Sequence, residues 1–329
     1  MDNKFSIRKV GEQDVAGLAI LYEQVWPEVS FDKTQKANFV LKESEGVSYC
    51  AVKDGEFVGS RTSFYMPLYF GERKIKCVQF ADSCIRKDYR RQGLFLKMNQ
   101  AFLKGFFGEN EGELVYNISV DASRAAYEKL GWNYIKSLHG CRKYMRPFRT
   151  LFKIKFDPRK LRGALLFDGI SDTTVLDPQL LIAREEFFQK KDLLHVKYTE
   201  ESFAWRMKSG NSIRVYQSPS LGAIVYKLAH KPSGVSFISI GEVFLYEYNY
   251  DNFKKIIQAI DCDFKPDIIS ATITLGHPLL PFYHKFGIKG TNKKSSFLNQ
   301  GVRVESEEMK SICYKPENWA LSMLDIDIF

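Results

Sequence analysis

Residues 88–98, DYRRQGLFLKM, change from charged and polar side chains to apolar ones at Gly93. The preceding segment, 47–85, has the alternation of successive β-strands, with turns at KDGE and FGER. After Gly93, apolar residues recur at steps of three and four from Leu94 to Phe106, which is one face of a helix. The sequence therefore predicts a strand, a short loop and a helix in direct succession. Such a unit is typical of an α/β fold, and we expect a mixed sheet.

The predicted loop has the composition of an anion-binding site. The first amides of a helix lack intrahelical partners, and the helix dipole adds positive charge there. Gly93 allows close approach of the backbone, while Arg90 and Arg91 supply donors that match phosphate oxygens. The spacing is neither GxxxxGK[ST] nor GxGxxG, which disfavours a nucleoside triphosphate or NAD. The net charge of +9, without a basic tail, favours acidic small molecules at least as much as nucleic acid.

The strand and helix patterns occur twice along the 329 residues. The first series has the order β-α-α-β-β-β-α-β-α-β and closes near Met145. The second has helical patterns at 178–190, 200–208, 252–261 and 281–288, and strand patterns at 212–217, 222–229, 235–248 and 267–274. AAYEKLGWNYI, from residue 125, also resembles PFYHKFGIKGT, from residue 281. The prediction is a duplicated fold with domains at 1–146 and 147–329.

The joint between the two predicted domains is basic. Residues 142–162 contain nine Lys or Arg and one acid, and Pro147 and Pro158 interrupt the segment. We expect irregular structure here. The segment is either a solvated linker or a positively charged lip for an acidic substrate.

Cysteine and histidine usage indicates neither a zinc site nor a disulfide framework, because no CxxC pair occurs and the two residue types are scattered. The cysteines are Cys50, Cys77, Cys84, Cys141, Cys262 and Cys313, and the histidines are His139, His195, His230, His277 and His284. The polar N-terminal stretch has no signal-peptide core, and no apolar run reaches the roughly 20 residues of a membrane span. We therefore expect a soluble cytoplasmic protein with reduced thiols and no metal.

Two motifs resemble one known family. IRKDYRRQGLFLKM is similar to the acetyl-CoA pyrophosphate loop of the GCN5-related N-acetyltransferase (GNAT) superfamily, whose pattern is [RQ]-x-x-G-x-[GA]. Arg90 and Gly93 match the first two fixed positions, and Phe95 departs from the small residue at the last. NISVDASRAAYEKLGW, residues 117–132, resembles the strand and helix that follow in that family. The second half resembles the family only in topology and lacks the loop, as in Fem-type aminoacyl-transferases and mycothiol synthase, which have a degenerate second copy.

The resemblance implies one cofactor site, in the first half, for acetyl-CoA as co-substrate. The pantetheine would pair with the strand end near Cys84 and Ile85, and the pyrophosphate would rest on the loop amides. The cofactor-binding residues implied are Cys84, Ile85, Arg90, Arg91, Gln92, Gly93, Leu94, Phe95 and Asn117.

Acyl transfer to an amine needs a base for the attacking ammonium and an acid for the departing thiolate. The resemblance places Tyr127 at the general acid; the alternative is packing beneath Trp132. Asp82 is the candidate base, and strand alternation predicts Phe80, Asp82 and Cys84 on one face. The alternative for Asp82 is a structural carboxylate paired with Arg86 or Arg61. Cys84, without a partnered histidine, is expected to be a buried packing thiol.

The acceptor is expected to be a small primary amine, such as an amino sugar or amino acid, in a cleft between the halves. Trp205 and Arg206 would stack on and clamp it, unless they serve helix packing and a surface ion pair. Together with Asp325 and Asp327, they resemble proteins encoded with bacterial surface-polysaccharide genes. Two other functions stay open. These are Fem-type transfer from an aminoacyl-tRNA and a non-catalytic binding module.

Overall fold

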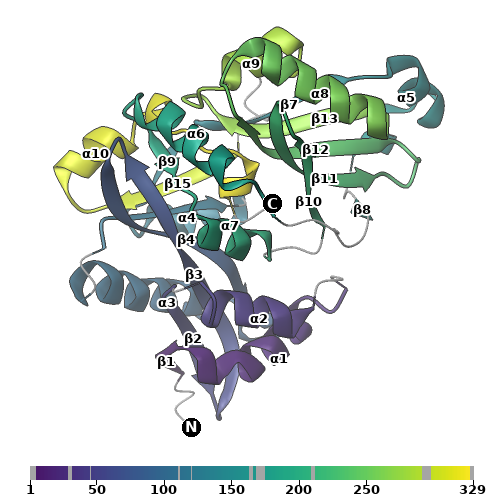
Figure 1. The fold of residues 1–329 in the computed structure, drawn as a ribbon. Helices are drawn as coiled ribbons and strands as arrows, with labels where there is room; N and C mark the ends of the chain where they lie inside the picture. The colour runs from purple at the N-terminus through teal and green to yellow at the C-terminus, as the bar shows by residue number, and fades with distance from the viewer. Residues whose placement is uncertain are drawn as a thin grey trace. The chain divides into compact units, whose positions relative to one another are not determined.

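The computed structural model describes residues 5–28, 32–44, 46–109, 112–119, 121–162, 166–167, 175–208, 212–290 and 298–326 (Figure 1). Its contacts divide the chain into two compact units. The first unit comprises Met1–Leu68, Lys74–Ile135 and Asn299–Tyr314, and the second comprises Tyr69–Arg73, Lys136–Leu298 and Lys315–Phe329. These units differ from the predicted division after residue 146, because each includes a strand from the other half of the chain.

The first unit is built on a sheet with the strand order β1-β2-β3-β4-β5-β15-β6, in which β4 and β5 run parallel. The strands are β1 (Ser6–Val10), β2 (Ser48–Lys53), β3 (Glu56–Phe70), β4 (Arg73–Ile85), β5 (Leu114–Ser119), β6 (Asn133–Ile135) and β15 (Asn299–Val304). The helices are α1 (Val15–Val25), α2 (Lys33–Leu41), α3 (Leu94–Leu103), which continues as a π-helix over Lys104–Glu109, α4 (Asp121–Glu128) and α10 (Glu307–Cys313).

Helix α3 packs on the sheet through its apolar face. Leu94 and Met98 cluster with Ala51 of β2 and Val58 of β3. Phe102, one turn further along, belongs to a second cluster on the side of β4 and β5. In Figure 1, α3 lies on one side of the strands, and α1 and α2 lie on the other. The helix that follows the loop is therefore anchored along its whole length.

The second unit is built on a sheet with the strand order β10-β11-β12-β13-β7-β14. The strands are β7 (Leu138–Tyr144), β8 (Leu166–Phe167), which pairs with β11, β9 (Leu194–Val196), β10 (Ile213–Ser218), β11 (Gly222–His230), β12 (Ser236–Leu245), β13 (Ile268–Thr274) and β14 (Lys289–Gly290). The helices are α5 (Pro147–Lys153), α6 (Pro178–Gln189), α7 (Glu200–Met207), α8 (Tyr250–Phe264) and α9 (Leu280–Phe286).

The two sheets share one arrangement. Strands β12 and β13 are parallel, as β4 and β5 are, and β7 lies between β13 and β14 as β15 lies between β5 and β6. The similar peptides of the sequence occupy corresponding places at the ends of α4 and α9. Gly131 has φ +83° and Gly287 has φ +92°, both left-handed turns that favour glycine. The predicted mixed α/β fold is confirmed, and the two sheets repeat one arrangement of strands.

The basic joint is more ordered than the sequence predicts. It contains α5, and its cations bind buried or half-buried carboxylates instead of facing only water. Arg146 donates to Asp261 at 2.7 Å, and Lys153 forms an ion pair of 2.7 Å with Asp267, which Arg149 also binds. These pairs attach the segment to the second unit and account for its charge without a substrate.

Two expectations about the whole chain can be compared with the structure. The six cysteines form no disulfide, and only Cys262 is exposed. Among the residues that the structure describes, no helix combines the length and apolarity needed to cross a membrane.

Candidate active site

The two central strands of the first sheet, β4 and β5, separate on the side where β4 leads into the loop at residues 86–93. Strands β4 and β5 pair only from Cys77 to Gln79, opposite Leu114 to Tyr116, although β4 continues to Ile85 and β5 to Ser119. The two strands therefore part beyond Gln79. Their separation leaves backbone groups of β4 without β5 as a partner, which is the geometry expected for a ligand that adds to the strand.

Strand β4 does not keep the predicted alternation past Asp82, which has a left-handed φ of +43°. Phe80 lies beneath the Arg61 guanidinium at 4.1 Å, whereas the Cys84 sulfur lies 3.2 Å from the Ser60 hydroxyl. Because Ser60 and Arg61 are neighbours on β3, their side chains occupy opposite faces of the sheet. The prediction that Phe80, Asp82 and Cys84 share one face is therefore wrong.

The loop after β4 has two successive left-handed positions, Arg91 at φ +62° and Gly93 at φ +75°. A Cβ atom on Gly93 would meet no atom within 4 Å, so the backbone there faces open space. Arg90 Nε donates a 3.0 Å hydrogen bond to the Ile85 carbonyl and fastens the loop to the end of β4. Helix α3 begins at the next residue, Leu94, with its free amides toward the loop.

A cavity of about 460 Å³ lies at this junction. Its lining residues are Val25, Trp26, Ser83, Cys84, Ile85, Arg90, Arg91, Gly93, Leu94, Phe95, Leu96, Ser123 and Ala126. Most of the predicted cofactor-binding residues are in this list; Gln92 and Asn117 are not. Gln92 Nε2 donates to the Asp88 carbonyl at 3.3 Å, and Asn117 Oδ1 accepts a 3.1 Å bond from Trp132. The sequence analysis did not assign six of the lining residues to the site. Leu96, Ser123 and Ala126 lie within the two family motifs, whereas no motif marks Val25, Trp26 and Ser83.

The chemistry of the lining combines cations with apolar walls. Arg90 and Arg91 stand at one part of the cavity, beside the amides at the start of α3. Burial raises the pKa of the Cys84 thiol to about 12, which keeps it protonated and a poor nucleophile. The site can hold an elongated anion, and Cys84 serves packing as expected.

Tyr127 lies in the interior beside the cavity and is 3% exposed. Its hydroxyl accepts a 2.5 Å hydrogen bond from Arg61, whose second nitrogen donates to the Ala81 carbonyl at 3.1 Å. Its ring meets that of Phe95 edge to face, with centroids 5.1 Å apart. Tyr127 is not among the lining residues, although Ser123 and Ala126 of the same helix are.

Arg61 is the main polar residue that the sequence analysis missed in this role. It is 1% exposed and lies within β3. The stretch FVGSRTSF, which follows Glu56, contains no other charged residue. A lone cation inside such a strand signals a buried charge that needs partners.

Asp82 forms an ion pair with Lys36 of α2, at 3.1 Å, and both side chains are mostly buried. Neither of the two predicted partners binds it. Arg61 binds Tyr127, and Arg86 binds Glu56 and Asp88 at the surface. Its carboxylate therefore lies on the strand segment that parts from β5, next to a cation supplied by a helix.

Arg206, one of the two candidate acceptor residues, has a packing role in the structure, whereas Trp205 is half-buried. Arg206 is 1% exposed and donates to the backbone carbonyls of Leu324 at 2.6 Å and Ile326 at 2.5 Å. Asp325 is buried and accepts a 2.9 Å bond from the Tyr198 hydroxyl. Asp327 lies outside the described residues. The alternative of a surface ion pair does not fit the burial of Arg206, whose contacts hold the C-terminal segment.

Two neighbouring residues of β7 meet a residue of α9 in the second unit. His139, Cys141 and His284 each offer one ligand atom, and these atoms lie within 4.8 Å of one another. The expectation of no metal rested on a scattered distribution of cysteines and histidines along the chain. That premise overlooked His139 and Cys141, which are two residues apart, and the fold brings His284 to them.

Comparison with known proteins identifies the first unit. Residues 6–135 match a family model described as an acetyltransferase (GNAT) domain. This part of the chain, which is less than half of it, is therefore similar to the acetyltransferase (GNAT) domain. No protein with a curated description matches the chain.

Solved structures show a similar fold over nearly the whole chain. A GCN5-related N-acetyltransferase from Anabaena variabilis has a TM-score of 0.63 at 12% identity, over 92% of this chain and 73% of that one. One from Kribbella flavida has a TM-score of 0.61 at 10% identity, over 92% and 72%. Saccharomyces cerevisiae N-myristoyltransferase with bound myristoyl-CoA has a TM-score of 0.53 at 10% identity, over 92% and 78%. At these identities the likeness concerns the fold.

Proposed function

We propose that the protein transfers an acetyl group from acetyl-CoA to the primary amine of a small acceptor by direct attack. The observation that carries the proposal is the cavity at the parted strands, lined by Arg90, Arg91 and the left-handed Gly93. A pyrophosphate there would meet two guanidinium groups and the first amides of α3. The pantetheine would extend along Ser83 to Ile85, where β4 has parted from β5.

The proposed chemistry uses two side chains at the parted strands. The Asp82 carboxylate takes a proton from the acceptor ammonium, and the freed amine nitrogen attacks the thioester carbonyl carbon. The carbon–sulfur bond then breaks, and Tyr127 donates its phenolic proton to the departing thiolate. Arg61 already donates a hydrogen bond to the Tyr127 oxygen and so stabilises the phenolate that remains. Asp82 is then the base and Tyr127 the acid.

The identity of the acyl group is part of the proposal. Myristoyl-CoA is bound in the yeast N-myristoyltransferase, which shares the fold. Here Phe95 lines the cavity and packs on Tyr127, in the place where the family pattern has a small residue. A ring at this position narrows the space near the loop, which favours a two-carbon acyl group over a long chain.

The test is calorimetric titration of the purified protein with acetyl-CoA, compared with the double variant Arg90→Glu/Gly93→Asp. Two carboxylates at the cavity would repel the pyrophosphate, so we expect the affinity to fall by at least about 100-fold, which corresponds to about 3 kcal/mol. Octanoyl-CoA and myristoyl-CoA, titrated in parallel, report the acyl preference.

The matched control is Gly55→Asp, because Gly55 is also left-handed, at φ +84°, and also has no atom near its Cβ position. This variant carries the same backbone strain in the turn between β2 and β3, so acetyl-CoA should still bind. Equal loss in the control would mean that strain, not the loop, explains the effect. Absence of binding by the native protein would overturn the proposal and favour the tRNA-dependent or non-catalytic function.

A further inference from the structure

We propose that His139, Cys141 and His284 bind one zinc ion in the second unit. The site is independent of the acyl-CoA cavity and of the transfer chemistry. It revises the expectation that the chain has no metal ligands.

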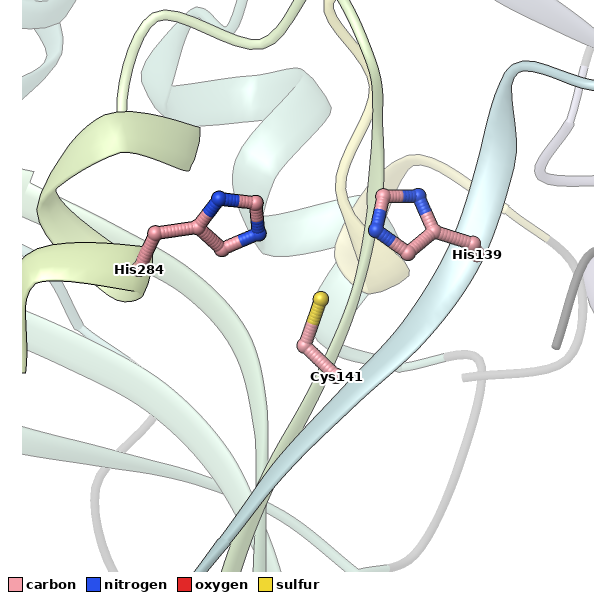
Figure 2. A group of neighbouring side chains, drawn as sticks. All are labelled: His139, Cys141 and His284. Atoms are coloured by element: carbon pink, nitrogen blue, oxygen red, sulfur yellow. The ribbon is translucent and has the colours of Figure 1, made fainter. Parts of the chain in front are cut away.

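Two of the ligands come from one strand and the third comes from a helix packed beside it. His139 and Cys141 are two residues apart on β7 and therefore share a face of that strand. His284 lies on α9. In Figure 2, the two imidazole rings and the thiol point toward a common space, with the sulfur between the rings. The three donors thus converge on one point.

The spacing of the donors is close to that of a zinc site. Zinc–ligand bonds of about 2.0–2.3 Å in a tetrahedron place donor atoms about 3.3–3.8 Å apart. The three donor atoms here lie within 4.8 Å of one another without an ion. His284 is exposed, so its ring can turn inward by the remaining ångström without displacing the core. His139 and Cys141, at 5% and 2% exposure, are held in place by packing.

The surrounding residues fix this arrangement. Gly290 of β14 pairs with Cys141, and a Cβ atom at Gly290 would lie 2.5 Å from Cδ2 of His139 and 2.8 Å from Nε2. Only glycine leaves room for the His139 ring there. Lys143, two residues after Cys141 on β7, donates a 2.7 Å hydrogen bond to the Phe286 carbonyl at the end of α9. The strand and the helix that carry the ligands are therefore tied together next to the site.

The donor set suits zinc. One thiolate and two imidazoles are borderline-soft ligands that bind Zn²⁺ in proteins, and three protein ligands leave a fourth position for water. The exposed His284 lies where that water would enter. Bound zinc would join β7, from the first half of the sequence, to α9, from the second, and so stabilise the second unit.

The test uses the full chain, stripped with a chelator and titrated first with ZnCl₂ and then with CoCl₂. We expect one ion per chain, a higher melting temperature with zinc, and a thiolate-to-cobalt charge-transfer band that Cys141 alone can supply. His284→Gln and Cys141→Ser should each weaken zinc binding by more than about tenfold. The cobalt band should vanish in Cys141→Ser.

The control is Cys262→Ser, which removes an exposed thiol elsewhere and should change neither stoichiometry nor spectrum. His284→Gln alters an exposed residue, so loss of binding in this variant cannot be a folding defect of the core. Absence of binding in the native chain would overturn the proposal. Equal affinity in His284→Gln, or a cobalt spectrum without the thiolate band, would also overturn it.

Discussion

In each sheet two central parallel strands part, but the space between them is open in the first unit and occupied by the C-terminal segment in the second. In the first unit, the space where β4 leaves β5 opens into the cavity of about 460 Å³ beside the arginine loop. In the second unit, β12 and β13 pair only from Phe237 to Ile240 and then also part. There the chain's own C-terminal segment pairs with β13, through the bridge between Ile273 and Ser322.

The C-terminal segment is bound in this place by buried polar groups. Thr274 Oγ1 donates to the Trp319 carbonyl at 2.5 Å and accepts from the Leu321 amide at 2.8 Å. Arg206 holds the carbonyls of Leu324 and Ile326. Where the first unit has a loop with a left-handed glycine before α3, the second passes from β12 to α8 through a short turn capped by Asn249.

The same contrast appears in one pair of carboxylates, each three residues before the end of its central strand. Asp82 of β4 faces Lys36 and keeps some exposure to solvent. Glu242 of β12, next to a register shift, is 1% exposed and binds Arg184 at 2.9 Å. The comparison indicates that a duplicated fold keeps its strand irregularity, while the charge placed there can serve either chemistry or stability.

Tyr127 and Tyr283 provide the sharpest test, because they occupy corresponding helix ends. We expect Tyr127→Phe to lower kcat by about 100-fold or more through loss of the general acid, with the Kd for acetyl-CoA unchanged. Tyr283→Phe should leave kcat unchanged, since burial holds the pKa of this hydroxyl well above its usual value and no cofactor loop adjoins it. Steady-state kinetics of both variants provides the measurement. Full activity of Tyr127→Phe would refute the acid assignment.

The two carboxylates should show effects of opposite kinds. Asp82→Asn should lower kcat by about 100-fold, with a smaller loss of unfolding free energy than Glu242→Gln, because Asp82 and Lys36 keep 16% and 15% exposure. Glu242→Gln should leave kcat unchanged but lower the free energy of unfolding by about 3 kcal/mol, because the buried Arg184 would lose its 2.9 Å partner and keep only the longer, 4.0 Å pair with Asp325. Urea unfolding and acetyl-transfer kinetics, measured on both variants, show whether each carboxylate affects stability, activity or both. Loss of activity in Glu242→Gln at full stability would contradict the division of roles.

Local pattern was sufficient for most of the fold. The periodicity of apolar residues and the turn residues predicted the helices and strands around Gly93. The two similar peptides near Tyr127 and Tyr283 predicted the duplication. The exchange of β7 and β15 between the sheets could not be predicted, because pairing partners far apart in sequence leave no local signal. Strand β15 also has no clear alternation, and its short stretch NQGVRV matches a loop as well as a strand.

The sequence predicted those residues of the candidate active site that lie within the loop motif. The loop residues line the cavity because the chain is continuous there, whereas Arg61 reaches Tyr127 across the sheet, which no spacing rule describes. The left-handed φ of Asp82 reversed the facing of Cys84, and period-two reasoning cannot anticipate such a residue. The meeting of His139 and Cys141 with His284 likewise depends on how α9 packs on β7.

The C-terminal segment should matter for stability but not for the cofactor. Arg206→Met removes two charged donors from buried carbonyls and should lower the free energy of unfolding by about 2 kcal/mol. Arg159→Met, at an arginine whose side chain is 81% exposed, is the matched control and should change little. Urea unfolding reports stability, and calorimetry should give an unchanged Kd for acetyl-CoA. A raised KM for an acceptor, at unchanged stability, would instead support the clamp.

The smallest expected effect is the pH dependence of the stability that Glu242 contributes. Burial by itself would raise the pKa of Glu242, but Arg184 and then His277 outweigh it and hold the pKa at about 2. A carboxyl whose folded pKa is lowered stabilises the protein above its unfolded pKa, near 4.5, and loses this contribution as the pH falls toward 2. The difference in unfolding free energy between the native protein and Glu242→Gln should therefore change by less than about 0.3 kcal/mol from pH 7 to 5. It should shrink only below about pH 4.5, as urea unfolding across this range can show. A difference that already falls between pH 7 and 5 would mean that Glu242 is not held ionised by Arg184.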